Sequence, residues 1–298
     1  MSFSYETKVE LCKLPQGSKC CAVAECYGML LYCNTFSTRE IRIITGNHEL
    51  GRRIIERFSY AFSILFDILP EKSKTGKQSY IINAPEKLSH IFEVYGFSTD
   101  NLLAHHVNLG VLEEDCCRRS FIRGAFLAGG AITDPEKSYH LELVTDHYSV
   151  SRETYSLLLE MGFNPKETVR GGNNITYFKQ SSAIEDFLTM IGAPIHAMEL
   201  MSAKIEKDMR NSVNRKVNCD TANVTKIIDA AAIQIDAIKK IENAGAFEAL
   251  PEKLRQTAHL RLQNPELSIK ELAEASTPPV TKSCVNHRLR KIIEISDT

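Results

Sequence analysis

Residues 121–132 read FIRGAFLAGGAI, and residues 138–148 read SYHLELVTDHY. The first stretch is mostly apolar, as a buried helix is, and the second alternates apolar and polar residues, which is typical of a strand with one buried face. Roughly 96 residues earlier the chain carries a similar pair, CCAVAECYGMLLYC at 20–33 and REIRIITGNHE at 39–49. This similarity indicates an internal duplication.

The two copies continue in the same order. Three pairs of matching residues are each 96 positions apart: Gly28 and Gly124, Ile81 and Tyr177, and Gly96 and Gly192. Each copy therefore predicts the order α-β-β-α-β-α, and together they predict a pseudo-twofold α/β (α+β) body. The later segments are a helix at 51–62, a polar turn at 72–77, a strand at 78–83 and a helix at 85–97, matched by 151–163, 171–174, 175–180 and 181–193.

The first helix of each copy carries small residues four positions apart. These are Ala24 and Gly28 in the first copy, and Gly124 and Ala128 in the second. Residues at i and i+4 lie on one face of a helix, and small side chains there allow two helix backbones to approach closely. We therefore expect these two helices to pack against each other at the pseudo-dyad.

The composition is that of an ordinary globular protein. The chain has 298 residues, of which 43% are hydrophobic and 24% charged, and its formal net charge is −1. This excludes a wholly disordered chain, and the net charge by itself gives no indication of nucleic-acid binding. The first residues do not have the pattern of a signal peptide, and the apolar stretch at 121–132 is too short to span a bilayer.

The nine cysteines do not have the spacing of a disulfide framework or of a zinc site. Two adjacent pairs, Cys20-Cys21 and Cys116-Cys117, are present, but the chain has no C-x-x-C motif. We therefore expect reduced thiols, no bound metal and no cofactor.

Residues 251–298 have the pattern of a helical DNA-binding domain. A helix starts near Pro251, and Ser268 and Glu271 have the spacing of a capping box at the start of a second helix. The prolines of STPPVT at 276–281 end that helix, and Thr281 caps the last one. Two helices joined by a tight turn after a supporting helix indicate a helix-turn-helix, within an all-α domain.

The last helix has an apolar and a basic face. Val285, Leu289, Ile292 and Ile293 fall on one side, and from Val280 to Lys291 there are four Lys or Arg residues and no acidic one. Such a helix suits DNA recognition, because donors can read bases while cations hold phosphates. Solvated charge on an exposed helix is the alternative. The predicted DNA-binding residues are Lys282, Ser283, Asn286, His287, Arg288, Arg290 and Lys291.

An asparagine-rich segment precedes this domain. Asn211, Asn214 and Asn218 would share a helix face, with Arg210 and Arg215 beside them. These five residues could contact DNA, or the asparagines could cap backbone groups where two domains meet.

A new helix of about 20 residues is predicted after this segment. Asp220 or Thr221 would cap it. Its apolar stripe comprises Val224, Ile227, Ile228, Ala231, Ile235, Ile238 and Ile241.

Four stretches carry a resemblance to known families. FIRGAFLAGGAI at 121–132 looks like a degenerate LAGLIDADG motif of homing endonucleases, and ECYGMLLYCNTF at 25–36 looks like its more eroded partner. RNSVNRKVNCDTAN at 210–223 and TKSCVNHRLRK at 281–291 closely resemble the WhiA family, which extends the match along the whole chain. The resemblance implies a LAGLIDADG-like half at 1–105, a second at 106–197, a linker at 198–220 and a helix-turn-helix domain at 221–298.

The resemblance also locates the catalytic positions of the nucleases. An acidic residue near the end of each motif helix binds the metal there, and the alignment places Cys33 and Gly129 at these positions. Glycine has no side-chain oxygen, and a thiol is a poor ligand for Mg²⁺. We therefore expect no cleavage and assign no catalytic residue. Asp134 lies past the second motif, and the first copy has no clear counterpart.

In homing endonucleases the sheets form a saddle on DNA. The corresponding residues here are of mixed charge. A DNA contact on one side, and a solvated face or a protein contact on the other, therefore remain equally good interpretations. The candidates are Arg39, Arg42, Asn47, His48, His140, Asp146 and His147.

The resemblance implies a sequence-specific transcriptional regulator of sporulation and cell-division genes, which is cytoplasmic, at the nucleoid, and not an enzyme. Its expected partners are double-stranded DNA at promoters and another transcription regulator, with no membrane and no small-molecule substrate. Two alternatives are a metal-dependent DNA endonuclease and a nucleoid-associated scaffold that binds DNA non-specifically.

Overall fold

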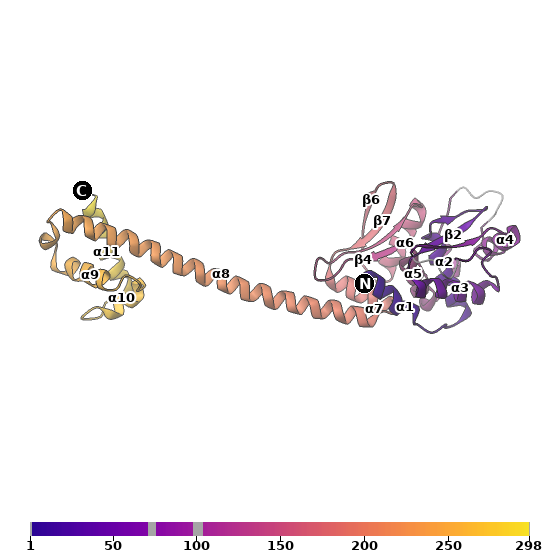
Figure 1. Ribbon diagram of the computed structural model, residues 1–298, viewed down its shortest axis with the longest axis horizontal. Helices are drawn as coiled ribbons and strands as arrows, with labels where there is room; N and C mark the ends of the chain where they lie inside the picture. The colour runs from indigo at the N-terminus through magenta and orange to yellow at the C-terminus, as the bar shows by residue number, and fades with distance from the viewer. Residues whose placement is uncertain (1, 71–75, 98–103, 298) are drawn as a thin grey trace. The chain divides into compact units, whose positions relative to one another are not determined.

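The computed structural model describes residues 2–70, 76–97 and 104–297, and the chain divides into two compact units, Met1–Lys207 and Asp208–Thr298 (Figure 1). The division falls inside the segment that the sequence predicts as a linker. Across the described ranges, every helix is too short or too polar to cross a lipid bilayer.

The first copy has the predicted order of elements. It follows an N-terminal helix α1 (Phe3–Cys12), which the sequence pattern did not predict. Its three strands form an antiparallel sheet in the order β1-β2-β3. Of the polar turn at 72–77, only Gly76 and Lys77 lie in the described part of the chain. The elements are α2 (Lys19–Leu31), β1 (Thr35–Phe36), β2 (Ile41–Thr45), α3 (His48–Phe62), β3 (Gln78–Ile82) and α4 (Pro85–Val94).

The second copy repeats this order with one additional strand, β6 (Lys166–Arg170). All five residues of β6 are exposed, so it has no apolar face from which a strand could be predicted. A two-residue turn, Gly171-Gly172, joins it to β7, and both glycines have positive φ, 59° and 84°. The sheet order is β4-β5-β7-β6. The other elements are η1 (Leu109–Val111), α5 (Asp115–Gly129), β4 (Gly130–Ile132), β5 (Leu141–Thr145), α6 (Tyr148–Glu160), β7 (Asn173–Phe178) and α7 (Ser181–Ile191).

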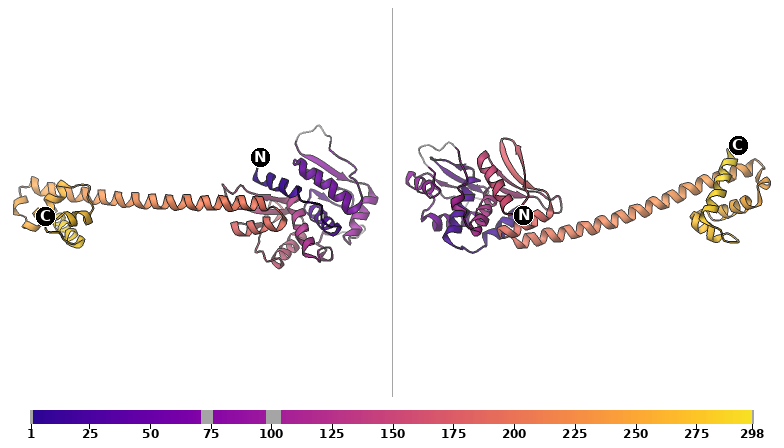
Figure 2. Two further views of the ribbon diagram at one scale, coloured as in Figure 1. Left: turned by 90° about the horizontal axis from the view of Figure 1, so that it is seen from below. Right: turned by 180° about the vertical axis from the view of Figure 1, so that it is seen from behind.

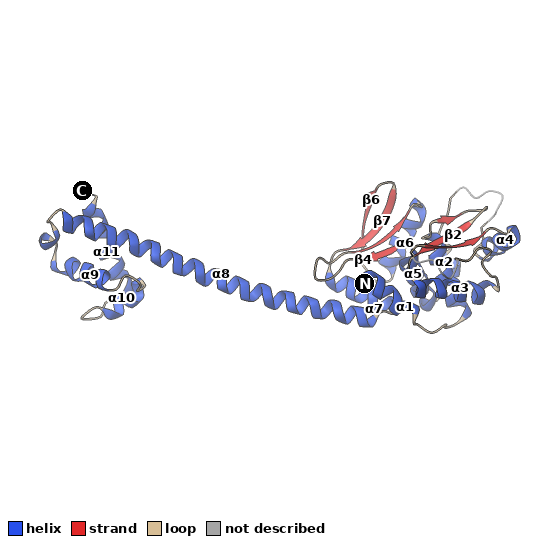
Figure 3. Ribbon diagram, viewed as in Figure 1, coloured by secondary structure: helices blue, strands red, loops and turns tan. Residues whose placement is uncertain are grey.

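Helices α2 and α5 pack directly against each other, as their small residues predict. A Cβ atom on Gly28 would lie 2.0 Å from the carbonyl oxygen of Phe121, and one on Gly124 would lie 2.0 Å from that of Glu25. The two contacts are equivalent under the duplication, because 28 + 96 = 124 and 25 + 96 = 121. The pseudo-dyad therefore passes through a helix crossing that only glycine permits. In Figure 3 the strands of this unit lie along one side, and most of its helices lie along the other.

The second unit is helical, as Figure 2 shows from two further sides. Helix α8 spans Pro194–Asn243, and the second unit contains its C-terminal part, from Asp208 on. The elements that follow are η2 (Phe247–Ala249), α9 (Glu252–Gln263), α10 (Ile269–Ala275) and α11 (Lys282–Ser296). Its core draws on all four helices: Ile238, Ile241, Phe247, Leu250, Leu254, Ala258, Leu272, Ala273, Val285, Leu289 and Ile292.

The predicted helix start at Asp220 or Thr221 is wrong. Both residues lie inside α8, which runs without a break for 50 residues. Residues 208–226 of α8 are all exposed, and the apolar side chains that recur there every four residues, Met209, Val213 and Val217, are not buried.

Candidate nucleic-acid interface

Helices α10 and α11 form the predicted helix-turn-helix, and their starts are fixed by side-chain caps. Ser268 Oγ accepts a hydrogen bond from Glu271 N (3.3 Å), and Ser268 N donates to Glu271 Oε2 (2.7 Å). This capping box stabilises the carboxylate and holds the pKa of Glu271 below its usual value. Thr281 Oγ1 accepts from Cys284 N (3.3 Å) at the start of α11. The predicted capping residues are therefore confirmed.

The connections between these helices are held by hydrogen bonds. Val280 N donates to Ala273 O (3.0 Å), and this bond ties the end of the α10–α11 turn to helix α10. Arg261 of α9 is almost completely buried and donates from Nη1 to Leu267 O (2.6 Å) in the α9–α10 connection. Sequence reasoning missed Arg261, because an arginine in a helix usually indicates an exposed face. The turn is therefore a fixed support for α11.

The inner face of α11 is the predicted apolar one. Val285, Leu289 and Ile292 are at most 1% exposed and pack in the core with residues of α9 and α10, while Ile293 is half-buried. Burial of each large aliphatic side chain contributes roughly 1.5–3 kcal/mol. Rotation of α11 would expose these residues, so packing determines which of its side chains face solvent.

The outer face of α11 carries most of the predicted DNA-binding residues. The exposed ones are Lys282, Ser283, His287, Arg290 and Lys291. Asn286 and Arg288 are half-buried, and Arg288 Nη1 donates to Thr257 Oγ1 of α9 (3.3 Å). The structure thus brings five of the seven residues together on one exposed surface and directs Arg288 partly toward α9.

The candidates on α8 are fully accessible. All five residues are exposed, and Arg215 Nε donates to Asn211 O one turn earlier (3.2 Å). The five residues are Arg210, Asn211, Asn214, Arg215 and Asn218.

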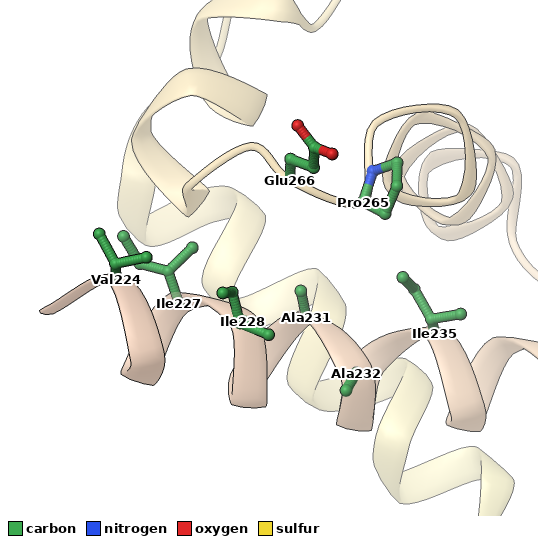
Figure 4. A pocket seen from close by; sticks show the side chains of 8 residues that line it. All are labelled: Val224, Ile227, Ile228, Ala231, Ala232, Ile235, Pro265 and Glu266. Atoms are coloured by element: carbon green, nitrogen blue, oxygen red, sulfur yellow. The ribbon is translucent and has the colours of Figure 1, made fainter. Parts of the chain in front are cut away.

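An apolar groove lies elsewhere on the second unit. Figure 4 shows six side chains of α8 on one side of it and Pro265 and Glu266 of the α9–α10 connection on the other. Among the eight lining residues there is one carboxylate and no cation, so this groove is unsuited to phosphate. The predicted stripe of α8 is thus buried at Ile238 and Ile241, but Val224 and Ile228 stay largely exposed at the groove. The α8 side chains are Val224, Ile227, Ile228, Ala231, Ala232 and Ile235.

In the first unit, the positions of the nuclease acids lie at the C-terminal ends of α2 and α5. Cys33 Sγ donates to the carbonyl oxygens of Leu30 and Thr35, both at 3.1 Å, and burial raises the pKa of its thiol to about 12. A Cβ atom on Gly129 would lie 2.5 Å from Val144 O, too close for any side chain unless β5 shifts. Neither position offers a ligand for a hard divalent cation.

Two arginines on the sheets are paired with carboxylates. Arg42 Nε lies 2.9 Å from Glu40 Oε1, and Arg170 Nη2 lies 3.0 Å from Glu142 Oε1. Asn47 is buried as the N-cap of α3, where its Oδ1 accepts from the backbone of Glu49 and Leu50. The side-chain oxygen of Asn47 is therefore already used within the fold, and paired charges reduce the attraction of the sheets for phosphate.

Comparisons with known proteins give one consistent result. The model of the WhiA LAGLIDADG-like domain matches residues 118–210, and that of the WhiA C-terminal HTH domain matches residues 213–296. The protein named "probable cell division protein WhiA" from Ruminiclostridium cellulolyticum is 39% identical, over 100% of this chain and 97% of its own length. The protein of the same name from Alkaliphilus metalliredigens is 33% identical, over 100% of this chain and 98% of its own.

Solved structures show the same fold. The crystal structure of full-length WhiA from Thermatoga maritima matches with a TM-score of 0.60 and 28% identity, covering 100% of this chain and 98% of that one. The N-terminal LAGLIDADG domain of WhiA matches with a TM-score of 0.51 and 22% identity, over 64% of this chain and 92% of that one. The duplicated LAGLIDADG-like fold and the helix-turn-helix are thereby confirmed.

Proposed function

The chain belongs to the WhiA family, and we propose that it is a sequence-specific DNA-binding regulator of cell-division and sporulation genes that reads its sites with α11. The observation that carries this proposal is the exposed surface of Lys282, Ser283, His287, Arg290 and Lys291. This surface stands on a helix whose opposite face is locked in the core. A rigid helix that presents donors and cations on one side is what major-groove recognition requires.

Some residues of this surface would contact bases, and others would contact phosphates. Arg290 would donate to guanine O6 and N7, and Asn286 would bind adenine at the edge of the surface. Lys282 and Lys291 would neutralise phosphates at the two ends of the exposed stretch and release counterions. Arg288 would act mainly as a support, since its guanidinium donates to Thr257.

The remaining parts of the proposal rest on the first unit and on the residues of α8. The LAGLIDADG-like fold would serve as an inactive scaffold, because Cys33 and Gly129 offer no carboxylate and Gly129 has no room for one. Arg210, Asn211, Asn214, Arg215 and Asn218 would add contacts to DNA beside those of α11. The protein would act in the cytoplasm at the nucleoid, on promoters and with a second transcription regulator.

Fluorescence anisotropy of the full-length chain tests the central claim. The probes are a duplex carrying the promoter of its own operon and a scrambled duplex, at about 150 mM salt. We expect a preference for the promoter of about 10³-fold or more. Arg290→Ala should reduce this preference, costing about 1–3 kcal/mol on the promoter alone, whereas Lys282→Ala should weaken both duplexes alike and lower the salt dependence.

A control variant and a second assay separate the alternatives. Arg52 is an exposed arginine on α3, and Arg52→Ala should leave both affinities unchanged. Equal losses on both duplexes for Arg290→Ala and Lys282→Ala would refute α11 as the recognition helix and favour a non-specific scaffold. Plasmid DNA incubated with Mg²⁺ should stay intact; nicking that Asp134→Ala abolishes would instead establish an endonuclease.

A further inference from the structure

Two cysteine pairs meet at the N-terminal ends of α2 and α5. Cys20-Cys21 lies in the first turn of α2 and Cys116-Cys117 in the first turn of α5, and the pairs are related by the duplication, because 20 + 96 = 116 and 21 + 96 = 117. The Gly28–Gly124 crossing holds the two helices in contact. As a result, all four Sγ atoms lie within 4.8 Å of one another, and all four cysteines are free.

This spacing suits a single tetrahedral ion. A regular tetrahedron with edges of 4.8 Å has its centre about 2.9 Å from each vertex, and a zinc–thiolate bond measures about 2.3 Å. Each sulfur would therefore need to move inward by at most about 0.6 Å, which a change in χ1 can provide. Four thiolates in a tetrahedron are the ligand set that Zn²⁺ takes in structural sites.

The two helix N-termini favour the negative charge that such a site would carry. Zn²⁺ with four thiolates has a net charge of −2, and it would lie at two helix N-termini, where the backbone N–H groups attract anions. Neither N-cap residue, Ser18 or Glu114, makes a side-chain capping hydrogen bond, and the Cys117 N–H donates to the Glu114 carbonyl oxygen (2.9 Å). Arg119 and Arg123 line the same cavity as Cys21 and Cys116. Two carboxylates line it as well, Asp115 and Glu25, and Glu25 is paired with Arg123 (3.3 Å).

We propose that Cys20, Cys21, Cys116 and Cys117 bind one zinc ion, which joins the two halves of the first unit. Cys117 is buried and Cys21 half-buried, whereas Cys20 and Cys116 are exposed. The ion can therefore enter from solvent on the side of the exposed pair and be held by the buried thiols on the other side. The expectation of no metal was based on spacing along the chain. Through the duplication, each half contributes two cysteine ligands, as each C-x-x-C motif does in other zinc sites.

Metal analysis of the full-length chain tests the site directly. The protein is expressed with zinc in the medium, purified without chelators, and analysed by plasma mass spectrometry. We expect one zinc per chain, falling below about one tenth in Cys20→Ser/Cys117→Ser. Cys219→Ser, at an exposed cysteine on α8, is the matched control and should keep the full content. Replacement of zinc by Co²⁺ should give the visible absorption of tetrahedral cobalt thiolate.

A single substitution at an exposed cysteine tests the site even if the double variant does not fold. Cys116 is exposed, so Cys116→Ser removes one ligand without disturbing the core, and it should weaken zinc at least tenfold in competition with a chelator. Chelation should also lower the melting temperature of the wild-type chain by about 5 °C or more, and that of Cys116→Ser by less. The proposal is overturned if the wild-type chain takes up neither Zn²⁺ nor Co²⁺, or if peptide mapping shows disulfides between the two pairs.

Discussion

In the first half of the N-terminal unit, the interior beside the helix pair holds Glu25 and Arg57, whereas the equivalent positions of the second half hold Phe121 and Leu157. Glu25 and Phe121 are 96 positions apart. Arg57 and Leu157 are 100 apart, the same offset as between β2 and β5. The order of elements is common to both halves, but the buried chemistry is not.

Backbone contacts constrain this duplicated fold more strongly than the chemistry of its buried side chains does. The glycine contacts are present in both halves because they bring two backbones together, and no other residue fits there. Side chains farther along the interior can change from ionic to apolar, provided that each buried charge is paired.

The largest effect is expected at the shared helix crossing. Gly28→Val and Gly124→Val each place side-chain atoms within 2.0 Å of a backbone carbonyl. We expect each to destabilise the unit by more than about 5 kcal/mol, enough to unfold many domains. Circular dichroism on heating measures the loss. Gly46→Ala is the control, since its nearest atom would be 3.8 Å away. A clearly smaller effect at one of the two glycines would contradict their equivalence.

The next effect is specific to the first half. Glu25 Oε1 and Oε2 accept from Arg53 at 2.5 and 2.9 Å, and Arg123 of the second half lies 3.3 Å away. Glu25→Ala leaves two buried guanidinium groups, those of Arg53 and Arg57, and the half-buried one of the second half without their carboxylate. We expect the free energy of unfolding in urea to fall by about 3 to 5 kcal/mol. Glu56→Ala, at an exposed glutamate on α3, should cost less than about 0.5 kcal/mol. Similar values for the two variants would show that the buried pairing contributes nothing.

A pH dependence is expected where the halves meet. His105 Nε2 lies 2.7 Å from Phe36 O, and its ring centroid is 4.5 Å from that of His147 in the second half. Burial, followed by the neighbouring His147, lowers the pKa of His105 to about 4. Because an unfolded histidine titrates near 6.5, the unfolded state binds more protons between pH 6.5 and 4, so stability falls as the pH drops through this window.

The size of that effect can be measured. The loss contributed by His105 should reach about 2 kcal/mol at pH 5 relative to pH 7. His105→Gln retains an N–H donor for Phe36 O but does not titrate, so its unfolding free energy should change much less over the same range. An unchanged pH profile in this variant would assign the acid sensitivity to other groups, such as His147.

The smallest effect concerns helix caps. Asn47 caps α3 with its side chain, whereas His147, at the equivalent position 100 residues later, makes no capping hydrogen bond to α6. Asn47→Ala should therefore cost about 1 kcal/mol. Chemical denaturation of this variant beside Arg52→Ala, an exposed change on the same helix, gives the comparison. Equal midpoints for the two variants would show that the cap contributes no stability.

Local patterns in the sequence predicted much of the fold. Two kinds of local feature were confirmed: the glycines four positions from alanines, and the capping residues Ser268 and Thr281. The order of segments within each copy was confirmed as well. The apolar face of α11 was likewise readable, because a helix repeats every 3.6 residues. The additional strand β6 was not, since its exposed residues carry no such pattern. The full length of α8 was not predicted either, although Met209, Val213 and Val217 recur every four residues, as on one face of a helix.

Patterns in the sequence thus predicted the two LAGLIDADG-like halves, the helix-turn-helix and five of the residues that α11 presents to solvent. Only the tertiary structure brought four thiols together from positions 96 residues apart, paired Glu25 with arginines of both halves, and turned Arg288 toward Thr257. The physical reason is that periodicity reports which face of an element is buried. The distance between two residues on different elements depends instead on how those elements cross. For α2 and α5, that crossing is set by Gly28 and Gly124.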